Sequence, residues 1–572
     1  MRENTFRCEV GNGRTSSRKY YYVSKSAYIL DIPYDMDTGC FKPWRLYSET
    51  DEYKGNTVEE LRSLIPDLIN RLSLKKEKKA NRKTLDIDAI LIFVDNLFKA
   101  EDIFNGMITD HIQHGDKLKQ ITVMDNFIFQ GTNNWGLEAL SDQYSPLEVM
   151  QGVMNKWFIP RKRIFTGFPE IDRKYLETVS HNGKVAHTCE YYPKKLHDWN
   201  SLRSAMQSSI RFQCGSCGAH EKMLYIDLNS AYIYALMTFK HCASSFRKVS
   251  PLDWRDYLNR TDKGSWGAYT ITYSSYQAFI RCFRTYNKEE FHVGPHKTVI
   301  AVLTNVDLDI LMSLQGVTIE GIECHWLREF DMDYPPDYYR ECIKEGYLDK
   351  IHCIKNTVEY ALAKLKLNSG VFGNTIIKTP LDIYENAVAE GKSEQEATNL
   401  AQDKLYKMSK QGTLPQWGIW AISYIRKVIL ELGQNLTGWC YSNTDSIVCC
   451  DTEENRNYIK EYNQKTQEKI KVFCEKFGEN FEDLKNLGSF DITELSLFRA
   501  WDKSTYAYLE KGDDTLVVKA SGVKLKKHYT PEEIFKDITH KPKGEMWPQG
   551  YLDSDGHYRE HLVNAESMFL LY

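Results

Sequence analysis

Two short apolar segments, far apart in the chain, each lead into an aspartate. KMLYIDLNSAYIYALM (222–237) is typical of a strand that ends at Asp227 and is followed by an apolar helix, with Asn229 and Ser230 as candidate caps. GWCYSNTDSIVCC (438–450) is typical of two strands joined by a turn that contains Asp445. If the two strands are neighbours, both carboxylates meet at one edge of a sheet. This pair of segments therefore constrains the fold more than any other feature.

Two carboxylates at one sheet edge can share a divalent cation, and hard oxygen ligands favour magnesium or manganese. Two such ions, about 3.5–4 Å apart, would activate a hydroxyl nucleophile and neutralise a leaving pyrophosphate. Taken alone, Asp227 is more often a helix cap and Asp445 a turn residue. The residues by themselves leave both alternatives open.

Length and composition bound the class of protein. The 572 residues suffice for several domains, and 42% hydrophobic with 27% charged residues is the composition of an ordinary folded protein. No stretch approaches the roughly 18 apolar residues of a membrane helix, so we expect no membrane association. The start lacks an apolar signal segment and the 14 cysteines show no repeating framework, which predicts a cytoplasmic protein. A net charge of −4 lends no support to a wholly basic nucleic-acid binder and is compatible with local basic channels.

The chain divides by pattern. Residues 1 to about 205 alternate strand-like runs, such as 88–95, with helical runs, such as 57–72, and predict an α/β domain. Residues 356–374 begin as a helix and close in a glycine-containing turn, and the polar stretch 380–412 predicts a helical insertion facing solvent. The residues from about 524 have the size of a small appendage.

Three segments, in order, resemble the motifs of family B DNA polymerases. DLNSAYI (227–233) resembles the first catalytic motif, KLKLNSGVFG (364–373) the fingers motif and YSNTDSI (441–447) the third motif. VLTNVDLDILM (302–312) looks like the insertion of the protein-primed branch, the polymerases of small phages with linear genomes. VKASGVKLKKHYTPEEIFKD (518–537) resembles the passage from palm to thumb in the same branch.

This resemblance implies a multidomain α/β and α+β fold: a right-hand polymerase with palm, fingers and thumb, behind an N-terminal RNase H-like domain of exonuclease type. The expected division is 1–205 exonuclease-like, 206–240 palm, 241–335 insertion of the protein-primed type, 336–375 fingers, 376–416 second insertion, 417–523 palm and 524–572 thumb.

The resemblance also implies an activity and its partners. The chain would be a DNA-directed DNA polymerase of viral DNA replication that uses two Mg²⁺ or Mn²⁺ ions, primer-template DNA and deoxynucleotides. It would also start synthesis on the hydroxyl of a terminal protein, with a single-stranded DNA-binding protein as a further candidate partner. We expect a monomer, encoded by a phage or mobile element and working in the cytoplasm of a bacterial host. A catalytically silent binding relative and a template-independent nucleotidyltransferase remain as alternatives.

Site residues follow from the resemblance position by position. Asp227 and Asp445 would hold the metals, with the backbone carbonyl of Leu228 as a further ligand. Tyr232 would exclude the ribose 2′-hydroxyl, and Lys364 would neutralise the triphosphate as a point charge. The remaining nucleotide-binding candidates are Ser230, Asn368 and Phe372. The candidates for DNA contacts are Ser369, Gly373, Arg426, Thr444, Ser446, Lys503, Tyr506 and Lys519.

The sequence departs from the family pattern near the third motif. Asn443 stands where the first aspartate of this motif is usual; it keeps hydrogen bonding and removes one charge, which predicts weaker metal affinity. The fingers motif is one residue longer than usual, with Phe372 in place of tyrosine, and Lys503 is one residue out of register with Tyr506.

The N-terminal region departs further. Residues 31–39 offer Asp31, or Asp35 with Asp37, in place of the first exonuclease motif. Ala100 stands where the second motif needs an aspartate, with Asp102 just beyond, and Asp198 is a candidate third acid. We therefore expect an exonuclease-like fold whose proofreading is weak or absent.

Overall fold

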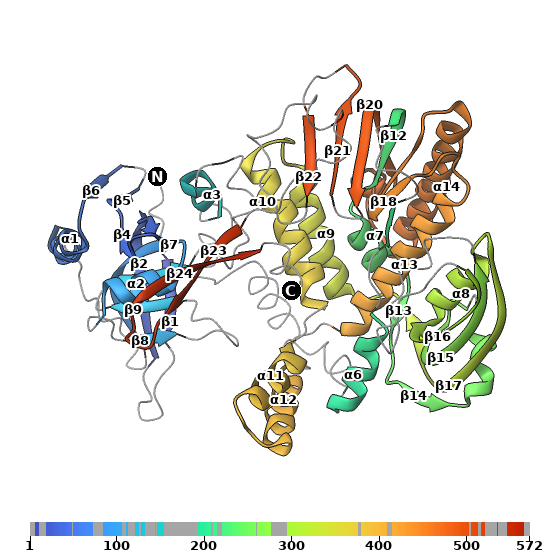
Figure 1. Cartoon of the computed structure of the whole chain (residues 1–572), viewed down its shortest axis with the longest axis horizontal. Helices are drawn as coiled ribbons and strands as arrows, with labels where there is room; N and C mark the ends of the chain where they lie inside the picture. The colour runs from blue at the N-terminus through green and yellow to red at the C-terminus, as the bar shows by residue number, and fades with distance from the viewer. Residues whose placement is uncertain are drawn as a thin grey trace. The chain divides into compact units, whose positions relative to one another are not determined.

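The structure is a computed structural model of the whole chain (Figure 1). None of the helices in its described part is long and apolar enough to cross a lipid bilayer. The described residues are 6–10, 19–48, 50–71, 84–105, 110–112, 121–124, 127–131, 144, 146–153, 191, 193, 195–206, 210–213, 220–258, 260–275, 294–375, 379–408, 414–502, 505–512, 516–520, 535 and 546–564.

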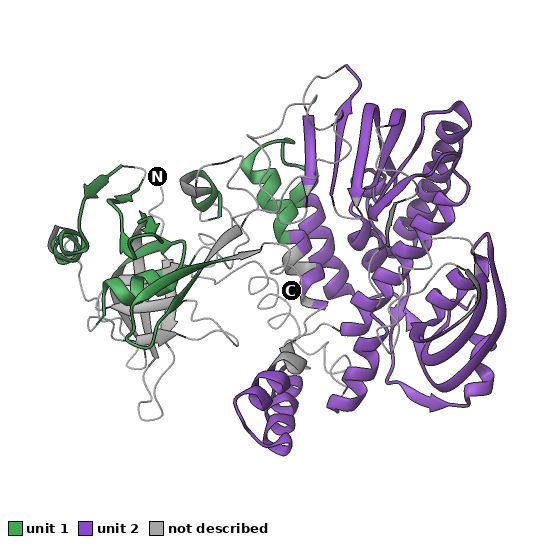
Figure 2. Cartoon of the chain, in the orientation of Figure 1, with its two compact units in different colours: residues 1–171, 349–366, 544–572 green, residues 172–348, 367–543 purple. Residues whose placement is uncertain are grey.

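The chain forms two compact units (Figure 2). Unit 1 comprises Met1–Ile171, Asp349–Lys366 and Gly544–Tyr572, and unit 2 comprises Asp172–Leu348 and Leu367–Lys543. The N-terminal region is thus joined in unit 1 by a central segment and by the C-terminal end of the chain. The finer division into polymerase subdomains stays a prediction.

Unit 1 is built on a mixed eight-stranded sheet in the order β6-β5-β2-β7-β10-β9-β8, with β1 paired to β2. β2 and β10 lie parallel to β7. The predicted strand at 88–95 is confirmed as part of β7. The strands are β1 (Phe6–Val10), β2 (Lys19–Asp31), β5 (Trp44–Tyr47), β6 (Glu52–Gly55), β7 (Thr84–Val94), β8 (Asp110–Ile112), β9 (Ile121–Met124) and β10 (Phe127–Gly131), and β3 (Tyr34–Asp35) pairs separately with β4 (Cys40–Phe41).

Apolar helix faces pack against this sheet. In α1 (Val58–Arg71), the predicted helix at 57–72, Leu61, Ile65 and Leu68 recur at helical spacing and are fully buried. They share one hydrophobic core with the central strand β7, which explains why the run is helical. The other helices of unit 1 are α2 (Leu97–Ile103), α3 (Pro146–Val153) and α10 (Val358–Lys366).

The C-terminal strands β23 (Met546–Leu552) and β24 (Tyr558–Asn564) form a hairpin that lies against α2 (Figure 1). At the end of α2 the Asp102 carboxylate accepts a hydrogen bond from the Tyr558 backbone N–H at 2.9 Å. The Tyr558 ring centroid lies 5.0 Å from that of Tyr34 and 5.8 Å from that of Phe41. The C-terminal hairpin is therefore packed on the N-terminal part of unit 1.

The main sheet of unit 2 is antiparallel and seven-stranded, in the order β11-β18-β19-β12-β20-β21-β22. Both segments predicted as palm contribute strands to it. The strands are β11 (Ile210–Gln213), β12 (His220–Leu228), β18 (Tyr441–Thr444), β19 (Ser446–Cys450), β20 (Phe490–Asp502), β21 (Thr505–Glu510) and β22 (Leu516–Ala520).

One face of this sheet is covered by helices. Leu224, Ile226 and Leu228 alternate along β12 and are buried in one core with residues of α7 (Ala231–Thr238), α13 (Pro415–Gly433) and α14 (Glu453–Phe477). The intervening residues of β12, Tyr225 and Asp227, are half-buried on the opposite face. This alternation decides which face of the sheet carries the predicted acids.

A second sheet of unit 2 has the order β13-β17-β15-β16, with β14 also paired to β17. Its strands are β13 (His241–Cys242), β14 (Arg247–Val249), β15 (Lys263–Ser275), β16 (Gly294–Thr304) and β17 (Val317–Asp333). The described part of the polar stretch 380–412 is helical, as predicted. The further helices of unit 2 are α6 (Leu196–Ser204), η6 (Pro251–Tyr257), α8 (Asn305–Ser313), α9 (Asp337–Ile351, which crosses into unit 1), η8 (Leu367–Phe372), η9 (Gly373–Thr375), α11 (Thr379–Ala389), α12 (Glu394–Met408) and α15 (Phe481–Leu484).

A buried ion pair joins α8 to α13. Arg426 donates from Nε and Nη2 to Oδ1 of Asp307 at 2.9 and 2.6 Å, and the two side chains are 1% and 0% exposed. The other carboxylate oxygen of Asp307 accepts hydrogen bonds from the hydroxyls of Thr304 and Ser423. Because both charges are bonded, their desolvation is offset by this network.

We predict that Asp307→Asn destabilises the protein by about 3–5 kcal/mol, because it leaves a buried guanidinium without its counter-charge. The double variant Asp307→Leu, Arg426→Met removes both charges and should cost clearly less. Urea denaturation measures both effects. Lys485→Met, which breaks the exposed pair with Glu482, is the control and should change stability by about 1 kcal/mol or less. An Asp307→Asn variant as stable as this control would contradict the prediction.

Candidate active site

The antiparallel pairing of β12 with β19 brings the two aspartate segments together. Asp227 lies opposite Ser446 in register, and the Leu228 N–H donates to the Asp445 carbonyl at 2.9 Å. Both aspartate side chains are half-buried. The prediction that the two strands are neighbours is confirmed.

The backbone is strained on both sides of this edge. Thr444, before Asp445, has φ 63°, and Ser230, after Asp227, has φ 52°, both in the left-handed region that a β-branched residue such as Thr rarely adopts. The Asn443 carbonyl accepts the Asp445 N–H at 2.8 Å and the Ser446 hydroxyl at 3.0 Å, and these bonds hold the tight turn. Such strain is retained where surrounding structure enforces it, which is common at functional sites.

A buried tyrosine of a third strand reaches the same edge. Tyr506 on β21 is 5% exposed, and burial raises the pKa of its phenol, with the charges of Asp227 and Asp445 adding to the rise. Its side chain hydrogen-bonds with those of Tyr225 and Asn443, which act in the opposite direction on this pKa. Tyr506 therefore stays protonated and ties the amide at position 443 into a polar network beside both aspartates.

The donor set at this edge fits a hard divalent cation. Two half-buried carboxylates, Asp227 at the end of β12 and Asp445 in the turn between β18 and β19, are oxygen ligands of the kind that Mg²⁺ and Mn²⁺ prefer. Within the described ranges, no three His, Cys, Asp or Glu side chains come together as a metal site. Asp227 and Asp445, with the carbonyl of Leu228 as a predicted third ligand, are therefore the residues that would hold an ion.

Reasoning from the sequence missed Asp491. It lies on β20 directly opposite Asp227, on the side away from β19. Side chains in such a pair share a face of the sheet with Cβ atoms about 4.5–5.5 Å apart, and like charges there are destabilising. Alternation along 490–495 could have marked a strand, but no local pattern gives its register against β12.

The fingers motif contributes an aromatic contact. The rings of Tyr232 on α7 and Phe372 on η8 stack with centroids 4.2 Å apart and planes at 16°. η8 is a π-helical turn, a rare form that occurs often at functional sites. Asn368 on this turn is exposed, Gly373 begins η9, and the side chain of Ser369 lies outside the described residues. The structure thus brings Tyr232, the predicted sugar gate, into contact with Phe372, the residue that differs from the family motif.

The three lysines predicted to bind the nucleotide or DNA lie in different parts of the chain. Lys364 is exposed on α10, which belongs to unit 1, so its approach to the aspartates stays a prediction. Lys519 is exposed on β22, opposite Tyr506 in register. Lys503 lies outside the described residues.

Two of the predicted site residues, Arg426 and Asp198, form ion pairs within the protein. Arg426 was a candidate for a DNA contact, but its guanidinium is buried and bonded to Asp307. A side chain without exposed surface has none to offer DNA, so we assign Arg426 to the interior ion pair. Asp198, the candidate third exonuclease acid, lies on α6 of unit 2 and accepts from Arg328 at 3.2 Å.

The other exonuclease candidates lie in unit 1. Asp31 and Asp37 are exposed, and Asp35 accepts the Asp37 N–H at 3.0 Å in the β3–β4 turn, which lowers the pKa of its carboxyl. Asp102 binds the C-terminal hairpin. The role of these acids in an exonuclease reaction stays a prediction.

Unit 1 also contains a buried lysine, Lys99. The Lys99 side chain is 5% exposed, and its Nζ donates to the Ile32 carbonyl at 3.0 Å and to Asp95 at 2.9 Å. Glu560 of the C-terminal hairpin lies 3.8 Å away. The buried ammonium of Lys99 therefore pairs with Asp95 and Glu560, neither of which is an exonuclease candidate.

The comparisons with known proteins agree on the fold. No protein-family model matches the sequence, and no curated protein does. Among solved structures, Phi29 DNA polymerase complexed with primer-template DNA matches with a TM-score of 0.61 at 10% identity, covering 94% of this chain and 99% of that chain. Its ternary complex with incoming nucleotides matches at 0.59 and 11%, and its complex with single-stranded DNA at 0.59 and 12%, with the same coverage. Over nearly its whole length, the chain has a fold similar to that of Phi29 DNA polymerase.

Proposed function

We propose that the chain is a template-directed DNA polymerase that adds deoxynucleotides to a primer 3′-hydroxyl. The observation that carries this proposal is the placement of Asp227 and Asp445 at one strained sheet edge by the pairing of β12 with β19. The order of the three motifs and the full-length likeness to Phi29 DNA polymerase support it. Initiation on a terminal-protein hydroxyl belongs to the same proposal, supported by the match at 302–312, which lies within β16, α8 and their connection.

Each residue has a defined task in this proposal. Asp227 and Asp445 hold the cations, and the left-handed residues Ser230 and Thr444 shape the backbone turns beside them. Divalent ions, when bound, activate the 3′-hydroxyl and neutralise the leaving pyrophosphate. Tyr232, braced by the Phe372 ring, limits the space at the sugar 2′ position. Lys364 binds the triphosphate as a point charge.

Removal of either acid should abolish synthesis. We expect Asp227→Asn and Asp445→Asn each to lower primer extension by about 1000-fold or more, since metal-held charge stabilisation is worth several kcal/mol. The assay is extension of a labelled primer on a heteropolymeric template, with a parallel reaction lacking template. Asp403→Asn, at an exposed position of α12, is the matched control and should retain full activity.

Each alternative has its own outcome in that assay. Equal extension without template would indicate a template-independent nucleotidyltransferase. A wild-type chain that binds primer-template but never extends it would indicate a silent binding protein. Either result, or extension by Asp445→Asn at the wild-type rate, would refute the proposal.

Substitutions that add or remove a negative charge near Asp227 and Asp445 should raise or lower metal affinity, respectively. Asn443→Asp adds a carboxylate beside Asp445 and should lower the Mg²⁺ concentration for half-maximal synthesis by about 10-fold, whereas Asp491→Asn should raise it. Mn²⁺ binding, measured by electron paramagnetic resonance without nucleotide, should follow the same order. Asn399→Asp, on the exposed face of α12, should change neither quantity. Identical Mn²⁺ affinity in all variants would rule out this electrostatic role.

We also propose that proofreading is weak or absent, because Ala100 stands where the second motif needs an aspartate and Asp102 already accepts a hydrogen bond from the C-terminal hairpin. A primer with a labelled, mismatched 3′ nucleotide, incubated with Mg²⁺ and no deoxynucleotides, should keep its label. Matched primer with deoxynucleotides, extended in parallel, shows that the preparation is active. Release of the mismatched nucleotide by the wild type, lost in Asp31→Asn or Asp102→Asn, would contradict this proposal.

A further inference from the structure

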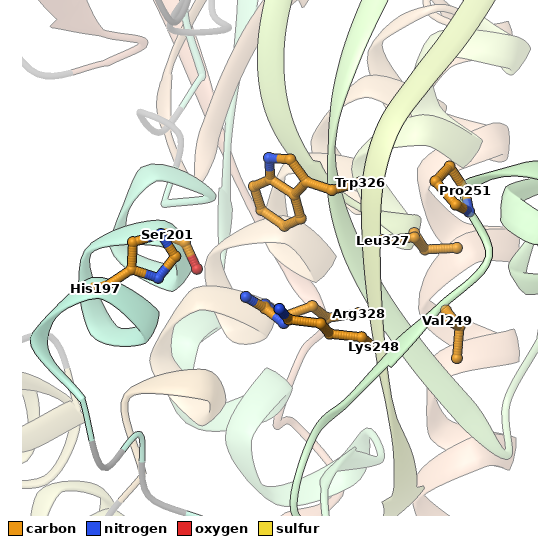
Figure 3. A pocket seen from close by; sticks show the side chains of 8 residues that line it. All are labelled: His197, Ser201, Lys248, Val249, Pro251, Trp326, Leu327 and Arg328. Atoms are coloured by element: carbon orange, nitrogen blue, oxygen red, sulfur yellow. The ribbon is translucent and has the colours of Figure 1, made fainter.

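A cavity of about 310 Å³ lies in unit 2 between helix α6 and strands β14 and β17 (Figure 3). None of the residues assigned to the candidate active site lines it. Figure 3 shows Trp326 and Arg328 extending from β17 toward the side on which α6 carries His197 and Ser201. The lining residues are His197, Ser201, Lys248, Val249, Pro251, Trp326, Leu327 and Arg328.

The cavity carries surplus positive charge. Lys248 and Arg328 are directly opposite each other in the antiparallel pairing of β14 with β17, an arrangement that is destabilising for like charges. Asp198 takes up part of this charge through its bond to Arg328. Lys248 takes part in none of the salt bridges found among described residues. An anion in the cavity would remove the remaining repulsion.

The Arg328 side chain is prepared to bind such an anion. The residue is 8% exposed, and its Nε is buried with no hydrogen-bond acceptor in the described part of the chain. A buried donor of a charged group is costly to leave unbonded. The planar guanidinium matches phosphate oxygens in geometry and charge, and the second donor, Nη2, is already fixed by Asp198.

Trp326 gives the cavity an aromatic wall. It is two residues from Arg328 on the same strand and therefore on the same face, and the Arg328 Cζ lies 5.8 Å from its ring centroid. Val249, Pro251 and Leu327 complete an apolar side. A flat aromatic ring beside two cations is the combination that binds a nucleotide, because the base stacks while the phosphate is neutralised.

We propose that this cavity binds one nucleotide unit, with its phosphate on Lys248 and Arg328 and its base against Trp326. The volume is at the low end for small-molecule sites, which fits a single unit. The unit is either a free nucleotide or one residue of a single strand. An acidic peptide would satisfy the cations but leave the Trp326 wall unused, so the nucleotide is favoured.

The test uses the full-length chain in EDTA, which silences metal-dependent binding. A 5′-phosphorylated tetranucleotide carrying 5-iododeoxyuridine is photocross-linked, and mass spectrometry locates the attachment. Affinities for this oligonucleotide, thymidine monophosphate, inorganic phosphate and hexaglutamate are measured by calorimetry over a range of salt concentrations. The variants are Trp326→Ala and Lys248→Met, with Lys471→Met, an exposed lysine on α14, as the matched control.

We expect cross-links to the peptide that contains Trp326. Trp326→Ala should weaken oligonucleotide binding by about 5- to 100-fold, as for loss of one stacked base. Lys248→Met should reduce the slope of log affinity against log salt by about 0.7, and Lys471→Met should leave it unchanged. Binding of the monophosphate as tight as that of the oligonucleotide identifies a free nucleotide as the ligand; markedly weaker binding identifies a strand.

Three results would overturn the proposal: cross-links that avoid this peptide, inorganic phosphate binding as tightly as either nucleotide, or tighter binding of hexaglutamate. Lys248 is on the exposed rim, so its variant tests the site even if Trp326→Ala fails to fold. The measurements need no primer extension, so they are independent of the polymerase activity proposed above.

Discussion

The antiparallel pairing of β12 with β19 is the constraint on which the candidate active site depends. It sets Asp227 opposite Ser446 and ends in the hydrogen bond from the Leu228 N–H to the Asp445 carbonyl. The register is held from the other face, where Leu224 and Ile226 are buried against the helices. A slip of one residue would expose them and turn Asp227 into the core. Hydrophobic burial, rather than any attraction at the site, therefore holds the two carboxylates close together.

Local pattern explains what could be predicted from the sequence. An apolar run ending on Asp227, with a helix directly after it, and a hairpin around Asp445 are features of neighbouring residues, and both are present. The helix at 57–72 follows from periodicity in the same way, and the helices within 380–412 follow from a polar, helix-forming composition. The order of three motifs then gave a reason to pair the two strands, which the periodicity alone did not.

What could not be predicted depends on partners far away in the chain. An arginine at position 426 fits a DNA contact as well as an ion pair, and only the packing of α8 on α13 brings Asp307 to it. Asp198 likewise meets Arg328 through the packing of α6 near β17. Asp491 needed the register of β20 against β12, which is set by burial over the whole sheet. In each case the type of the residue indicated a charged contact, but the sequence did not show which residue is its partner.

Distant partners also determine the contacts of the candidate exonuclease acids in unit 1. Two of these carboxylates already make contacts within the protein. Asp102 accepts the Tyr558 N–H and lies 3.3 Å from Nδ1 of His557, while Asp35 closes a turn. Lys99 adds a charged contact to the same hairpin, because its Nζ lies 3.8 Å from the carboxylate of Glu560. Asp102, a candidate metal ligand from the sequence, is thus used to dock the C-terminal hairpin, which belongs to unit 1.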